Sequence, residues 1–156
     1  MRMKRYKAQA SFELLITLTI GLAILLPIVT IAFIQVSSAN SSLSAIEAQQ
    51  ASGKLASIAT LVGSEGPPAK QVVQLSVPPG IRYIYLGTPN NSVGHEIIFV
   101  ISSPSGLSYI TSYTPINVTG NLGGITSTGT YLVNVTSYSS CPTYPQVSCV
   151  YMSPVV

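Results

Sequence analysis

The fold is decided by residues 7–34, KAQASFELLITLTIGLAILLPIVTIAFI, in which the end of a basic leader is followed by one carboxylate and then by a long apolar run. The run from residue 14 to residue 34 contains no charged side chain. At about 1.5 Å per residue, a helix of about 20 residues spans roughly 30 Å, the thickness of the hydrocarbon core of a bilayer. Residues 9–36 are therefore predicted to form a transmembrane helix.

Glu13 is the exception in this apolar segment. An ionised carboxylate inside a bilayer costs several kcal/mol unless it finds a partner or lies at the interface, so an intramembrane acid indicates function. The alternative is that Glu13 lies among the lipid headgroups near the helix N-terminus, where the helix dipole favours a negative charge.

The hexapeptide AQASFE, residues 8–13, resembles the class III signal peptide of archaeal type IV pilins and archaellins. In that family the leader is cut just before a Gln, and the pattern continues as Q-x-S-x-E-x-x-x-L. Gln9, Ser11 and Glu13 match these positions. Two positions differ, because Thr17 stands where the family has Leu and Ala8 stands where Gly is commoner before the cut.

The resemblance implies a filament subunit. A membrane-embedded prepilin peptidase would cut between Ala8 and Gln9, and the apolar helices would leave the lipid and assemble as a homopolymer. Cleavage creates an α-amino group at Gln9, one helical turn from Glu13. In a bundle of parallel helices, the Glu13 carboxylate of one subunit can then meet the terminal amine of its neighbour.

Two other interpretations of the N-terminus remain. A secretory signal peptide also has a basic start, and Ser37-Ser38-Ala39 offers a small-residue cleavage site, but its apolar core normally runs about 7 to 15 residues. A plain membrane anchor with an uncut leader is the other. Neither interpretation accounts for Gln9 and Glu13 together.

The basic charge is confined to the leader. The first eight residues carry Arg2, Lys4, Arg5 and Lys7, or +4, whereas the rest has three basic residues and four Glu, or −1, which together give the net +3. Positive charge stays on the cytoplasmic side, so the N-terminus is expected inside and the remainder on the cell surface. No basic patch outside the leader favours a nucleic-acid partner.

The segment after the span is expected to continue as a helix. Small and apolar residues recur every three or four positions from Ser44 to Val62, and Gly63 and the Gly-Pro-Pro sequence at 66–68 indicate its end. If the Ser and Asn residues at 37–42 do not break it, one helix runs from about residue 13 to residue 62. Otherwise two helices are joined by a hinge.

From residue 70 onward, short β-branched and aromatic runs alternate with turn residues. The candidate strands are residues 71–77, 81–86, 95–101, 107–113, 116–119, 130–136 and 147–151. The predicted class is α+β, with a long N-terminal helix followed by a small antiparallel β-sandwich-like head, or a curled sheet on the helix. The expected divisions are a leader (1–8), an assembly helix (9–36), its amphipathic continuation (37–66) and an extracellular domain (67–156).

Four Asn-x-Ser/Thr sequons begin at Asn40, Asn90, Asn117 and Asn134. Single sequons arise by chance in chains rich in Ser and Thr, but four on the expected outer side make them glycosylation candidates. Glycans would supply solubility to a domain with few charged residues.

Cys141 and Cys149 are the only cysteines. In an extracytoplasmic compartment, a local disulfide in the C-terminal region is favoured, with two free buried thiols as the alternative. A metal site is not expected, because two cysteines do not complete a tetrahedral shell.

The sequence does not favour an enzyme or a cofactor. It has one His, four Glu and no catalytic motif, and the adjacent His95 and Glu96 are expected as solvated or rim residues. Two function classes remain: a structural pilus-type subunit, whose tyrosines would serve adhesion, and an anchored surface-binding protein that never polymerises. The tyrosines could equally belong to the core of the sheet.

Overall fold

The computed structural model describes residues 3–90, 92–103 and 106–155, with side chains described from Ser11 onward. The chain divides into two compact units, Met1–Asn40 and Ser41–Val156. A single helix, α1 (Met3–Glu65), begins in the first unit and ends in the second. The chain is helical at every residue of 37–42, so of the two alternatives that the sequence left open the structure has one continuous helix.

Threonine hydroxyls in the first unit bond to the helix backbone itself. Thr17 Oγ1 donates to the carbonyl oxygen of Glu13 at 3.0 Å, and Thr19 Oγ1 donates to that of Leu15 at 2.7 Å. A hydroxyl that is satisfied within its own helix needs no partner from outside. These polar residues are therefore compatible with an apolar surrounding.

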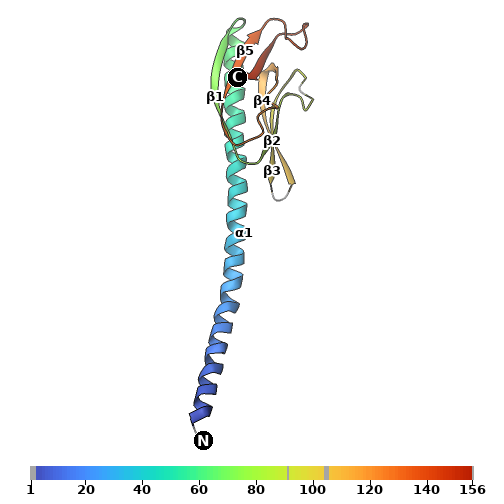
Figure 1. Ribbon diagram of the computed structural model, residues 1–156. Coiled ribbons are helices and arrows are strands. Elements are labelled where there is room, and N and C mark those ends of the chain that lie inside the picture. The colour runs from blue at the N-terminus through green and yellow to red at the C-terminus, as the bar shows by residue number, and fades with distance from the viewer. Residues whose placement is uncertain (1–2, 91, 104–105, 156) are drawn as a thin grey trace. The chain divides into compact units, whose positions relative to one another are not determined.

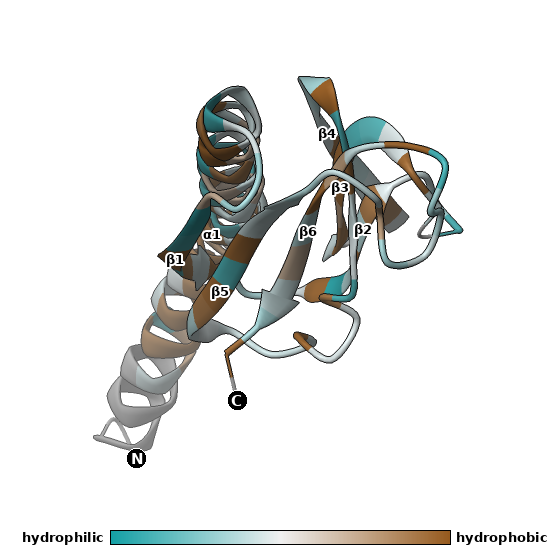
Figure 2. Ribbon diagram, turned by 90° about the horizontal axis from the view of Figure 1, so that it is seen from above, coloured by the Kyte–Doolittle hydropathy of each residue, from teal (hydrophilic) through white to brown (hydrophobic). Residues whose placement is uncertain are grey.

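The second unit contains the C-terminal part of α1 and one six-stranded sheet (Figure 1). The strands are β1 (Lys70–Val77), β2 (Ile81–Gly87), β3 (Gly94–Ser103), β4 (Gly106–Gly120), β5 (Gly129–Tyr138) and β6 (Cys149–Pro154). Their order in the sheet is β1-β5-β6-β4-β3-β2. Seen from above, β1 lies beside α1 and β2 lies at the other edge of the sheet (Figure 2).

The α+β class is confirmed, but the head differs from an antiparallel sandwich. The strands form one sheet, and β4 runs parallel to β6, with Val118 opposite Val150. The other four pairings are antiparallel. The segment between β4 and β6 includes all of β5, which explains how two parallel neighbours can be connected.

Two predicted strands, 107–113 and 116–119, are one strand, β4. This strand contains Pro115, which cannot donate to a strand ladder. In the structure, Pro115 lies where the register between β3 and β4 shifts, between the pairs Glu96↔Tyr113 and Gly94↔Val118. This bulge accommodates the missing donor, and β4 passes from its pairing with β3 to its pairing with β6.

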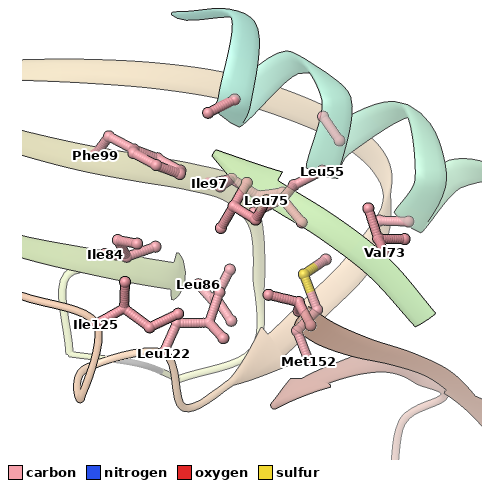
Figure 3. Close-up of a cluster of buried hydrophobic side chains, with 14 of the residues drawn as sticks. Leu55, Val73, Leu75, Ile84, Leu86, Ile97, Phe99, Leu122, Ile125 and Met152 are labelled. Atoms are coloured by element: carbon pink, nitrogen blue, oxygen red, sulfur yellow. The ribbon is translucent and has the colours of Figure 1, made fainter. Parts of the chain in front are cut away.

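The core of the head lies between one face of α1 and one face of the sheet (Figure 3). The buried helix residues recur every three or four positions and are mostly small: Ala48, Ala51, Ser52, Leu55, Ala56, Ala59 and Val62. Facing them are larger side chains from the strands, including Leu75, Ile97 and Phe99, which are fully buried. Alanine on the helix lets the sheet approach closely, so the larger residues of the strands fill the space.

Candidate assembly helix and head surface

The first half of α1 offers a continuous apolar surface that this unit does not cover. Every side chain in residues 11–36 is exposed. The large apolar side chains of this segment are between 43% and 76% exposed, with Ile16 and Phe33 at the two limits. By length and composition, the helix Ser11–Glu65 is able to cross a membrane. Such a surface must be covered by lipid or by other helices.

Glu13 lies two residues into the described part of this surface. Its side chain is exposed, and its backbone carbonyl accepts the hydroxyl of Thr17. Within the residues whose side chains are described, the structure records no ion pair to the Glu13 carboxylate. A partner for this charge therefore has to come from the leader region or from another molecule.

The predicted leader cleavage site has only a backbone description. Ala8 and Gln9 belong to α1, but their side chains lie outside the described residues. Ser11, the third position of the signal-peptide pattern, is exposed on the helix. The geometry between a new terminus at Gln9 and the carboxylate of Glu13 thus stays a prediction.

The second half of α1 has two different faces. One face is buried against the sheet, as described above, and the other carries Leu43, Ile46 and Leu61, which are 56%, 54% and 51% exposed. These three side chains lie nine or more residues after the apolar run ends at Ile34. A bilayer spanned by that run would not reach them.

The four sequons occupy different environments. Asn90 is exposed in the turn between β2 and β3, and Asn40 is exposed on α1. Asn117 and Asn134 lie within strands and are only partly exposed. The side chain of Asn117 donates to the carbonyl of Ser148 at 3.2 Å, so attaching a glycan there would break a bond that holds the C-terminal loop.

The predicted disulfide between Cys141 and Cys149 is confirmed, with a Cα–Cα distance of 5.4 Å. Both cysteines are buried, and because they are bonded to each other the free-thiol alternative is excluded. The loop that they close is also held by backbone bonds, including Cys141 N–H to the carbonyl of Val147 at 2.9 Å. The covalent link therefore fastens the start of β6 to the segment that follows β5.

His95 and Glu96 are both exposed, as predicted for rim residues. The His95 ring stacks on Tyr113 with a centroid distance of 5.7 Å, and its Nδ1 lies 3.1 Å from the carbonyl oxygen of Thr114. Over residues 11–90, 92–103 and 106–155, no group of three or more His, Cys or acidic side chains is placed to hold a metal ion. The geometry around His95 is that of a packed surface histidine.

The tyrosines divide between two environments, which the sequence left open. Tyr131 packs against the core, and its hydroxyl bonds to Ser127 at 2.6 Å. Tyr83, Tyr109 and Tyr113 are 53%, 65% and 70% exposed. The alternation along β4 separates the two faces of the sheet, since Tyr109 and Tyr113 are exposed on one face while Ser112 and Thr114 are buried on the other. Parity alone did not say which face was covered.

Comparison with protein-family models, curated proteins and solved structures finds no match to this chain. The class that the structure defines is therefore stated in physical terms. The chain is an α+β protein with a membrane-compatible N-terminal helix and a disulfide-bonded β-sheet head, an arrangement consistent with a membrane-anchored surface protein.

Proposed function

We propose that this chain is the subunit of a surface filament of the archaeal type IV pilus class. Its N-terminal helix would lie in the membrane first and would polymerise after the peptidase removes residues 1–8. The observation that carries the proposal is the uncovered apolar surface of residues 11–36, which begins with a single carboxylate at Glu13. Lipid would cover this surface before assembly, and neighbouring helices would cover it afterwards.

The second half of α1 favours polymerisation over a plain anchor. Leu43, Ile46 and Leu61 would face water in an anchored monomer, because the apolar run ends well before them. Packing of helices from several subunits along their length would cover these side chains as well as those of the span. Apolar contact continuing past the membrane segment therefore supports a helical bundle.

Glu13 supplies the axial register in this proposal. A carboxylate and an amine are each costly in an apolar bundle, and they become tolerable when they pair. If Glu13 of one subunit meets the amino group at Gln9 of the next, one contact fixes how far neighbouring helices slide. This pairing would explain why an otherwise uncharged surface retains one acid.

The test is to examine the protein as its cells display it. N-terminal sequencing of surface protein should give Gln9 as the first residue, and electron microscopy should show filaments that contain the chain. A mature N-terminus at Asn40 would instead establish secretory processing and overturn the proposal. Uncleaved protein that remains in the membrane fraction without filaments would establish the anchored alternative.

A further inference from the structure

One face of the sheet carries a cluster of tyrosines that the core does not use. The cluster, called the tyrosine face below, consists of Tyr83 and Tyr85 on β2 and Tyr109 and Tyr113 on β4. The strand register places Tyr83 and Tyr109 on either side of Val100. Paired residues in a sheet share a face, so these side chains form one cross-strand row.

The tyrosine face points away from α1. Ser112 on β4 bonds to Ser52 of the helix at 2.8 Å, which fixes the direction of alternate residues on that strand. Tyr109 and Tyr113 have the opposite parity and therefore project from the other side of the sheet. They remain 65% and 70% exposed, although the ring of His95 stacks on Tyr113.

The tyrosines lie over an apolar floor. Ile98 and Val100 of β3 are paired with Tyr85 and Tyr83 of β2 and share their outer face, yet they are only 6% and 1% exposed. Two of the four rings are also packed on one another. Tyr83 and Tyr85 have centroids 5.8 Å apart with an angle of 21° between their planes. The result is a fixed aromatic surface with hydroxyl groups, whose side chains lose little freedom on binding.

We infer that the tyrosine face binds a neutral carbohydrate. The C–H face of a pyranose packs on an aromatic ring, while its hydroxyl groups bond to polar groups at the ring edges. Here each ring carries a phenol hydroxyl at its edge, and Glu96 shares a row with Tyr113, where its carboxylate can accept hydrogen bonds from sugar hydroxyl groups.

The charge of the head supports a neutral partner. The unit Ser41–Val156 holds three Glu and three basic residues, Lys54, Lys70 and Arg82, so its formal charge is zero with His neutral. An anionic polymer would require a basic surface, and a strongly basic partner would require an acidic one. A polymer of uncharged sugars needs neither.

This inference rests on the proposed function, because the filament is what makes the binding strong. A flat, open surface binds one sugar segment weakly, but a filament repeats the tyrosine face in every subunit. Linked sites convert later contacts with one polysaccharide into intramolecular events, so avidity greatly exceeds the affinity of a single head. Repeating glycans on a surface are therefore the expected substrate for attachment.

The test uses full-length protein, as filaments and as detergent-solubilised Glu13→Ala subunits. Both are applied to an array of neutral β-glucan, mannan and chitin oligosaccharides, with sulfated and uronic-acid glycans alongside. We expect binding to neutral members and at least a tenfold loss in the double variant Tyr83→Ala/Tyr109→Ala. Tyr109→Phe keeps the aromatic ring, so its affinity for neutral glycans should fall less than threefold.

Tyr144→Ala is the matched control, because Tyr144 is a 46% exposed tyrosine in the loop closed by the disulfide. It should change binding less than twofold. Equal loss in Tyr144→Ala, binding confined to acidic glycans, or no binding to neutral glycans would overturn the inference. So would loss of filament contacts in the double variant with unchanged glycan binding, since the face would then meet a second copy. If wild-type cells display no filaments while solubilised subunits still bind neutral glycans, the proposed function is refuted and this inference is not.

Discussion

The two halves of α1 differ both in composition and in environment. In residues 11–36, apolar side chains surround the helix and all are exposed. From Ala48 to Val62, a stripe of small and apolar residues is buried against the sheet. An apolar stripe finds its partner within the same chain, whereas a helix that is apolar all round requires partners from outside. The comparison separates what stabilises the head from what drives assembly.

The strongest test of this division is Glu13→Ala. Removing the acid should lower filament yield at least tenfold, because breaking a buried charge pair typically costs about 3 to 5 kcal/mol. The thermal unfolding midpoint of the head should not change, since Glu13 belongs to the other unit. Yield is measured by electron microscopy and by pelleting of sheared surface protein.

Glu13→Gln is the companion variant, and it should be intermediate if hydrogen bonding supplies part of the contact. Both variants require N-terminal sequencing to confirm that the leader has been removed. Wild-type filament yield from Glu13→Ala cells would show that the acid is only an interfacial residue. The anchored surface protein would then be the better proposal.

The opposite effect is expected at Gly87, in the head. Gly87 has φ of 86°, and a Cβ there would collide with the backbone of Ser92, Val118 and Gly94. Gly87→Ala should destabilise the head by at least about 3 kcal/mol, through strain and displacement of neighbouring strands. Urea unfolding followed by circular dichroism measures this loss.

Gly53→Ala is the matched control for Gly87→Ala. Gly53 is in the interior of α1, and a Cβ there meets nothing within 4 Å. Alanine is a better helix former, so this variant should be more stable by about 0.5 to 1 kcal/mol. Equal destabilisation of both variants would mean that Gly87 has no special conformational role.

Replacing both cysteines should have a smaller effect, again confined to the head. The variant Cys141→Ser/Cys149→Ser loses a crosslink that closes a short loop, worth about 2 to 3 kcal/mol in the chain-entropy model. Unfolded, non-reduced wild type should show no reactive thiol. Full thiol labelling of that sample would contradict the crosslink seen in the structure.

Residue patterns predicted the helix and strands of this fold better than they predicted how the strands pair. The apolar run, the three-to-four spacing after Ser44 and the Gly-Pro-Pro stop placed α1. The cysteine count predicted the disulfide. The parallel pairing of β4 with β6 is non-local, and no short pattern specifies it. The two strands expected at 107–113 and 116–119 are one strand, because a bulge that depends on β3 accommodates the missing N–H of Pro115.

The candidate sites show the same limit. The sequence identified Glu13 from its apolar surroundings, which is a local property. It could not rank the sequons, because the bond from Asn117 to Ser148 joins residues 31 positions apart. Nor could it assign the tyrosines to core or surface, since that depends on which face of the sheet α1 covers.

The smallest expected effect lies at the polar contact between α1 and the sheet. Ser52 is completely buried, and its hydroxyl lies 2.8 Å from that of Ser112 and 3.1 Å from the carbonyl oxygen of Gln49. The structure records no hydroxyl partner for Ser112 other than Ser52 among the described residues. Deleting one serine should therefore not have the same consequence as deleting the other.

Ser52→Ala should lower the free energy of unfolding by about 1 to 2 kcal/mol, because it leaves the buried Ser112 hydroxyl without its partner. Ser112→Ala should lower it by only about 0.5 to 1 kcal/mol, since Ser52 still bonds to the carbonyl of Gln49. The double variant should be no less stable than Ser52→Ala, because removing both hydroxyls also removes the unsatisfied group. A double-mutant cycle in urea, with filament yield measured in parallel, tests both statements. Additive losses would mean that the two hydroxyls do not interact, and a fall in yield without a change in stability would mean that this half of α1 also takes part in assembly through its sheet-facing side.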